Sequence, residues 1–172
     1  MTYYGGKELA ASFRTVRKNT IQIALDIPED QYGFKATPDV DSVASMLAHV
    51  AVSTHWAHRL HGVDKKTYVS FEDFGAYMAE SADLQKALLT KTDIVAALTA
   101  NGERFAAWLE SLTDADLGEK VSFPPPVEPP SRTRFEMLLG IKEHEMHHRA
   151  KLMLIERLLG IVPHLTRQRQ QR

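Results

Sequence analysis

Residues 141–160 read IKEHEMHHRAKLMLIERLLG and place three histidines within five consecutive positions of an amphipathic pattern. His144 and His148 are four residues apart, so on an α-helix they lie one above the other, about 40° apart around the axis. Residues 144–148 also fit H-E-x-x-H, the helix-borne signature of zinc peptidases. The stretch predicts a long helix and raises the question of which metal chemistry, if any, its histidines serve.

The histidine pair lies within the apolar stripe of this predicted helix. The apolar residues within about 80° of His144 on the helical projection are Met137, Ile141, Leu152, Ile155 and Leu159. Two imidazoles in a core are costly unless their nitrogens are bonded, and neither is easily protonated there. A metal ion bound by both would remove that cost, and imidazole binds zinc, nickel, copper and iron. The alternative that both are core histidines with separate hydrogen-bond partners stays open.

A third ligand is expected from another helix, and His49 is the strongest candidate. It lies on one arc of the predicted second helix with Met46, Val50, Ser53, Trp56 and Leu60. A lone histidine on an apolar face is also often a core residue with satisfied hydrogen bonds. His55 points about 120° away from His49, toward the more solvated side. His58 and His61 fall near the helix end, and steps of three residues sweep around a helix, so they do not converge with His55 on one ion.

The peptidase interpretation does not fit the downstream sequence. Zinc peptidases with this signature need a third ligand beyond the second histidine. Lys151 stands where the extended motif has glycine and Leu154 stands where it has the third histidine. Glu156 projects about 120° from His144 on the same helix. His147 points toward the edge of the apolar stripe and is expected at the surface or behind the ligands.

Four long helical patterns predict an all-α protein, a four-helix bundle with longer crossover connections. They cover residues 7–26, 39–62, 81–112 and 131–159. Asp39 is expected to cap the second helix, and Gly102 lowers the helix propensity of the third. The proline-rich segment FPPPVEPPS at 123–131 excludes helix and is expected to be a stiff linker. Residues 1–172 are expected to form a single domain, with a frayed basic tail at 167–172.

Composition narrows the class of protein. The chain has 172 residues, 44% of them hydrophobic, and no cysteine, which excludes disulfides and thiolate ligands. Its formal charge of −1 gives no electrostatic reason to expect nucleic acid or an anionic membrane as a partner. No stretch is apolar enough for a membrane helix, and the N-terminus lacks the pattern of a secretory signal. We expect a soluble, cytoplasmic protein.

The whole pattern resembles the DinB/YfiT-like superfamily of metal-binding four-helix bundles. The residues that carry the resemblance are SVASMLAHVAVSTHW at 42–56 and IKEHEMHHRAKLMLIERLLGIVP at 141–163. The resemblance implies a metal triad of His49, His144 and His148. Ala150 and Lys151 depart from the Gly-Gln that many relatives have there, so substrate contacts made at those positions do not transfer to this chain.

The resemblance implies a broad range of activities. Characterised relatives include transferases and isomerases that use a low-molecular-weight thiol and act on small electrophiles. We therefore expect a divalent transition metal, zinc or nickel first and iron as a further option, with a small-molecule substrate and a thiol or water as nucleophile. The residues do not identify a general base. We also expect a homodimer. The apolar strip of Phe135, Leu139, Met146 and Met153 is either its contact face or a further part of the core. The alternative function is that of a non-catalytic, metal-binding or stress-related structural homodimer.

Overall fold

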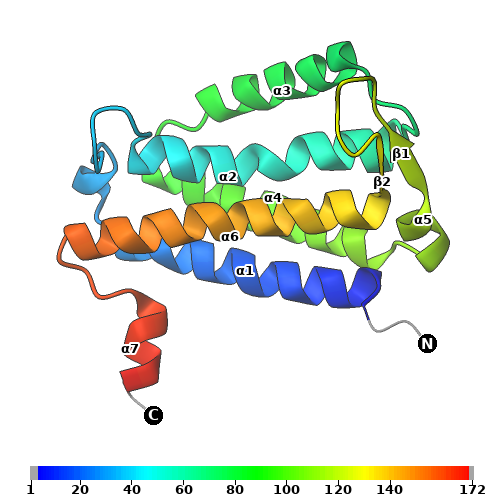
Figure 1. Cartoon of the computed structure of the whole chain (residues 1–172). Coiled ribbons are helices and arrows are strands. Elements are labelled where there is room, and N and C mark those ends of the chain that lie inside the picture. Colours follow the sequence, from blue (N-terminus) through cyan, green and yellow to red (C-terminus); the bar gives the residue numbers. More distant parts are fainter. Residues whose placement is uncertain (1–3, 171–172) are drawn as a thin grey trace.

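The computed structural model describes residues 4–170 and contains a four-helix bundle, as the sequence predicts (Figure 1). Each of the first two bundle helices packs against both of the last two. The bundle helices are α1 (Gly6–Asp26), α2 (Val43–His58), α4 (Lys91–Glu110) and α6 (Arg134–Leu158). Within the described residues, no helix has the length and apolar character needed to cross a membrane.

Two long connections interrupt the bundle and carry the remaining elements. The connection from α2 to α4 contains a π-helical turn (Arg59–Val63) and α3 (Phe71–Lys86), which packs on the outside of α2. The connection from α4 to α6 contains α5 (Asp114–Gly118) and a two-stranded antiparallel ribbon of β1 (Lys120–Ser122) and β2 (Ser131–Thr133). The remaining short elements are a 3₁₀ turn (Glu29–Gln31) and α7 (His164–Gln170). The predicted linker at 123–131 thus leads from one strand of this ribbon to the other.

The prediction of one continuous helix over 81–112 is wrong. The chain forms two helices there, because Thr90 starts α4 with a capping box: its hydroxyl accepts a hydrogen bond from the Asp93 backbone N–H, and the Asp93 carboxylate accepts one from the Thr90 N–H. Apolar residues at helical spacing occur both before and after this T-x-x-D signal, so the pattern alone predicts one helix. Gly102 does not interrupt α4.

The helix ends also differ from the prediction. Ser42 caps α2 in place of Asp39, whose carboxylate instead accepts a hydrogen bond from the Thr37 hydroxyl. Residues 131–133 form a strand, so α6 starts three residues later than expected. Residues 167–170 of the predicted tail form the last part of α7, and Arg167 forms an ion pair with Asp26 at 2.6 Å. Residues 171–172 of the predicted tail lie outside the described part of the chain.

The bundle interior consists of two apolar clusters with a polar layer between them. One cluster includes Leu98 and Leu152, and the other includes Phe13 and Phe105, whose rings meet edge to face at 5.1 Å. The buried polar side chains between these clusters are Arg17 and Thr20 on α1, Ser53 and Thr54 on α2, and Glu145 on α6. The candidate site lies in this layer.

Candidate metal centre

The structure brings the three predicted histidines together across α2 and α6. The Nε2 atom of His144 lies 3.1 Å from Nε2 of His49 and 3.1 Å from Nε2 of His148. All three imidazoles are half-buried, and one nitrogen of each lies within 4.8 Å of the others. In the part of the chain that the structure describes, this is the only group of three or more histidine or acidic side chains arranged to hold a metal ion.

Hydrogen bonds among the rings cannot account for both short contacts. A neutral imidazole nitrogen carries either one hydrogen or one lone pair in the ring plane. Nε2 of His144 can therefore donate to one neighbour or accept from one neighbour, but it cannot satisfy His49 and His148 together. A cation that accepts the lone pairs of all three nitrogens satisfies every contact. Tetrahedral zinc with bonds of 2.0–2.1 Å would separate its nitrogen ligands by roughly 3.3 Å, close to the observed spacing.

The environment keeps the pair on α6 in the neutral form that binds metals. Burial is the largest cause that lowers the pKa of His144, followed by the nearby His49. Burial and then the neighbouring His144 lower the pKa of His148 to about 4. Lone pairs on these two imidazoles are therefore available at neutral pH. The donor set of three imidazoles suits a borderline transition metal better than Mg²⁺ or Ca²⁺, which prefer oxygen.

Arg17 lies beside the triad and links the four bundle helices. From α1, its guanidinium forms a two-pronged ion pair with the Glu145 carboxylate on α6, with N···O distances of 2.9–3.1 Å. The same group donates to the carbonyl oxygens of Leu98 on α4 and Val50 on α2. Val50 follows His49 in the chain and Glu145 follows His144, so this one side chain binds the residues next to two of the three imidazoles.

Glu145 is therefore committed to Arg17, and it is fully buried. It is the residue that would be the general base if residues 144–148 worked as in a peptidase. Its orientation toward α1 adds a structural reason to reject that interpretation.

Sequence reasoning missed Arg17, although two signals were present. Arg17 is four residues after Phe13 and adjacent to Val16, so it lies at the apolar face of α1, where an arginine needs a buried partner. Gly102 is the second signal. A Cβ atom at this position would lie 2.7 Å from Cγ of Arg17, so the glycine leaves the space that the arginine stem occupies.

A cavity of about 440 Å³ opens next to the triad, between α2, α3 and α6. His49 and His144 form part of its wall. Most of the other wall residues are apolar: Val52, Trp56, Phe74, Met78, Ala82, Met137 and Ile141. The Ser81 hydroxyl also lines it and is buried without a hydrogen-bond partner within residues 4–170. Two ligand imidazoles are therefore reachable by a small molecule.

The other histidines lie outside the triad. His55 pairs with Glu80 at 3.0 Å on the outer side of α2. His61 is buried, its Nδ1 lies 2.8 Å from the Arg134 guanidinium, and burial followed by that charge lowers its pKa to about 3. His147 is exposed.

The sequence model of the DinB superfamily matches residues 12–152, which is most of the chain. The chain belongs to the DinB superfamily. No curated protein with an assigned function gives a significant match to this DinB-superfamily chain.

Two solved structures from Bacillus subtilis share its fold. The DinB-like protein YjoA superposes with a TM-score of 0.66 and is 22% identical, over 89% of this chain and 92% of YjoA. YfiT superposes with a TM-score of 0.66 and is 17% identical, over 94% of this chain and 91% of YfiT. YfiT is described as a probable metal-dependent hydrolase with an unusual four-helix bundle topology.

Proposed function

We propose that this DinB-superfamily protein is a metal-dependent enzyme that acts on a small electrophile, as a hydrolase or as a transferase that uses a low-molecular-weight thiol. The observation that carries the proposal is the convergence of three imidazole nitrogens at the wall of a cavity. His49, His144 and His148 would hold the metal. A site with three protein ligands keeps a coordination position open, which is typical of catalytic zinc sites.

Zinc or nickel suits three imidazoles best, and iron is a further option. Bound there, a divalent metal would act as a Lewis acid and lower the pKa of a water or thiol. The chain itself supplies no cysteine, so a thiol nucleophile would have to come from a small molecule. The description of YfiT as a metal-dependent hydrolase supports the version that uses water.

The cavity wall indicates an apolar or aromatic substrate. Trp56 and Phe74 face each other edge to face at 5.9 Å, and both also line a second, mostly apolar cavity that adjoins the first. Flat rings can stack on such side chains. The free Ser81 hydroxyl can bind one polar atom of the substrate and thereby orient it toward the histidines. Arg132 lines both cavities and is exposed, so it can contact a polar end of a longer substrate.

Two model reactions separate the versions of this proposal. Protein purified without an affinity tag would be loaded with zinc or nickel and tested for hydrolysis of p-nitrophenyl acetate. A second assay would couple glutathione to 1-chloro-2,4-dinitrobenzene. We expect one of these rates to depend on the metal and to disappear in His148→Ala but not in His55→Ala. Equal rates for the metal-loaded and metal-stripped protein in both assays would reject an enzymatic metal site of this kind.

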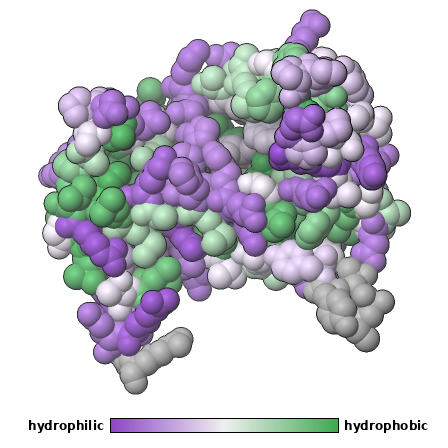
Figure 2. All heavy atoms as spheres, in the orientation of Figure 1, coloured by the Kyte–Doolittle hydropathy of each residue, from purple (hydrophilic) through white to green (hydrophobic). Residues whose placement is uncertain are grey.

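A non-catalytic homodimer is the second candidate, and one surface feature favours it. The predicted contact strip is largely covered within the chain, because Phe135, Leu139 and Met153 are partly buried against the two core clusters. Exposed apolar side chains instead follow a four-residue spacing along the outer side of α6: Met146, Ala150, Leu154 and Leu158. Hydrophobic surface gathers over the C-terminal end of this helix (Figure 2).

Such a ridge can pack against its own copy across a two-fold axis. Light scattering at micromolar concentration should give twice the mass of one chain, and Leu154→Glu should shift the mass toward one chain without loss of metal. A single-chain mass for the unaltered protein would reject this dimer. Full metal occupancy in a dimer that turns over neither model substrate would favour the non-catalytic candidate.

A further inference from the structure

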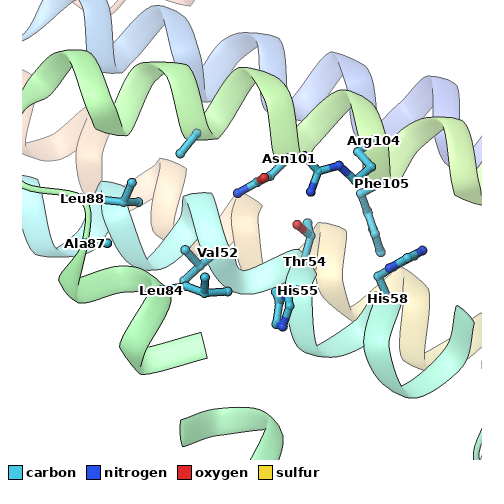
Figure 3. A pocket seen from close by; sticks show the side chains of 11 residues that line it. Val52, Thr54, His55, His58, Leu84, Ala87, Leu88, Asn101, Arg104 and Phe105 are labelled. Carbon is cyan, nitrogen blue, oxygen red and sulfur yellow. The ribbon is translucent and has the colours of Figure 1, made fainter. Parts of the chain in front are cut away.

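A separate cavity, of about 370 Å³, lies on the other side of α2 from the metal centre (Figure 3). It is bounded by α2, α4 and the C-terminal end of α3. No histidine of the triad lines it, and Val52 is the only residue that it shares with the cavity beside the triad. The proposed metal chemistry therefore does not use this space.

One end of the cavity gathers polar side chains with unused hydrogen-bonding groups. Thr54 is 3% exposed, and its hydroxyl makes no hydrogen bond within residues 4–170. Thr20 shows the usual alternative for a buried helical threonine, since its hydroxyl donates to the Val16 carbonyl one turn earlier. In Figure 3 the Thr54 oxygen points into the space between Asn101 and Arg104. A hydroxyl that faces a cavity without a partner in the protein can bind a polar atom of a ligand or a water there.

The charge at this end is positive. The Arg104 guanidinium turns toward Thr54 and Asn101, and no ion pair to Arg104 occurs in the described part of the chain. The Asn101 amide donates one hydrogen to the Ala51 carbonyl at 3.0 Å and keeps a second one. No acidic residue lines the cavity. Glu80 does not line the cavity, but it forms ion pairs with His55, which does, and with Arg59.

The opposite end of the cavity is apolar. Figure 3 shows Val52, Leu84, Ala87 and Leu88 together, away from the Arg104 and Thr54 side chains. Leu84 is 43% exposed although it borders the cavity, so its apolar surface is not used by contacts within the chain. The space therefore combines a cationic, hydrogen-bonding end with an apolar end, the usual composition of small-ligand sites.

We propose that this cavity binds a small monocarboxylate with an apolar tail. The Arg104 guanidinium and the Thr54 hydroxyl bind the carboxylate, and the tail lies against Leu84 and Leu88. Arginine pairs with carboxylates through two parallel hydrogen bonds, which gives it an advantage over lysine in such a role. A cationic ligand is disfavoured because it would lie against Arg104 with no carboxylate to balance it.

Calorimetric titration of the full-length, metal-loaded protein tests the proposal with hexanoate as the probe. We expect saturable binding, with an affinity at least about tenfold lower in Arg104→Gln, because a charge-assisted hydrogen bond contributes about 1.5–3 kcal/mol and 1.4 kcal/mol is tenfold. Arg104 is exposed, so this variant should fold. Hexanamide has the same apolar tail as hexanoate but no charge, and sulfate is an anion without an apolar tail. Both should bind more weakly than hexanoate.

Two control variants keep the sites apart, because carboxylates also coordinate metals. Arg132→Gln alters an arginine of the cavity beside the triad, and His148→Ala alters the triad. Hexanoate should bind both variants as it binds the unaltered protein. Binding that disappears in His148→Ala or Arg132→Gln would place the ligand at the metal side and overturn the proposal. Absence of binding, an unchanged affinity in Arg104→Gln, or equal binding of sulfate would each overturn it too.

Discussion

Arg17 and Glu145 form a two-pronged ion pair in the centre of the bundle, 128 positions apart in the sequence and almost completely buried, with side chains 4% and 1% exposed. The pair lies in the polar layer between two apolar clusters, next to the backbone of the histidine triad. Carbonyl oxygens of α4 and α2 accept hydrogen bonds from Nη1 and Nη2, so the buried charge is paired and each guanidinium nitrogen makes at least one hydrogen bond.

Replacing Arg17 with Met should lower the free energy of unfolding by about 3–5 kcal/mol, because it leaves the Glu145 carboxylate buried without a partner. The double variant Arg17→Met/Glu145→Met should lose less than Arg17→Met alone, since it buries no unpaired charge. Urea denaturation measures both. Arg14→Gln is the matched control on the same helix. Its ion pairs with Glu103 and Glu110 are exposed, so the loss should stay at about 0–1 kcal/mol. Equal losses at positions 14 and 17 would contradict this account.

Replacing Gly102 with alanine is expected to destabilise the protein, although alanine is usually favoured over glycine inside a helix such as α4. Alanine has a higher helix propensity by about 1 kcal/mol, but its Cβ would lie 2.7 Å from the Arg17 side chain. Gly102→Ala should therefore lower the midpoint of thermal unfolding. Gly75, inside α3, has no atom within 4 Å of the corresponding Cβ position, so Gly75→Ala should raise the midpoint. A higher midpoint of thermal unfolding in both variants would show that the Arg17 side chain can move away from the added Cβ atom without a loss of stability.

Glu156 is expected to make stability depend on pH. Its carboxylate is fully buried without a hydrogen-bond partner in the described residues, and burial followed by the charge of Asp26 raises its pKa from 4.5 to about 7, against the opposing effects of Arg167 and Arg157. Between these two values the folded protein holds a proton that the unfolded chain has released. The free energy of unfolding therefore falls as pH rises through this window.

Glu156→Gln should remove that fall. The difference in the free energy of unfolding between the variant and the unaltered protein should shift by about 1–3 kcal/mol in favour of the variant when the pH rises from about 4 to 8. Urea denaturation of both proteins across this range provides the comparison. Parallel stability curves would mean that Glu156 stays hydrated when the protein is folded.

Metal content should follow the triad and no other histidine. His148→Ala removes one of three nitrogens and should release most of the bound zinc or nickel, because two imidazoles seldom hold such an ion. His55→Ala should leave metal content unchanged, since His55 pairs with Glu80 away from the triad. Elemental analysis of untagged protein measures both variants. The same metal content in the two would refute the proposed ligand set.

The sequence by itself determined the helical class, the bundle and the face on which His144 and His148 lie. These features depend on periodicity within a helix, and the helix repeat fixes which residues share a face. The same local reasoning placed His49 on the inner face of α2. This reasoning missed the break before Thr90, because the apolar residues on both sides of the capping signal have the spacing of one continuous helix.

The tertiary structure decided what crosses between helices. That His49 meets the α6 pair, that Arg17 reaches Glu145, and that Gly102 makes room for it all depend on how α1, α2, α4 and α6 pack. The cavities on the two sides of α2 depend on where α3 lies against that helix. The physical reason is that distances between side chains on different helices are set by the packing of the whole core, which no single helical pattern contains.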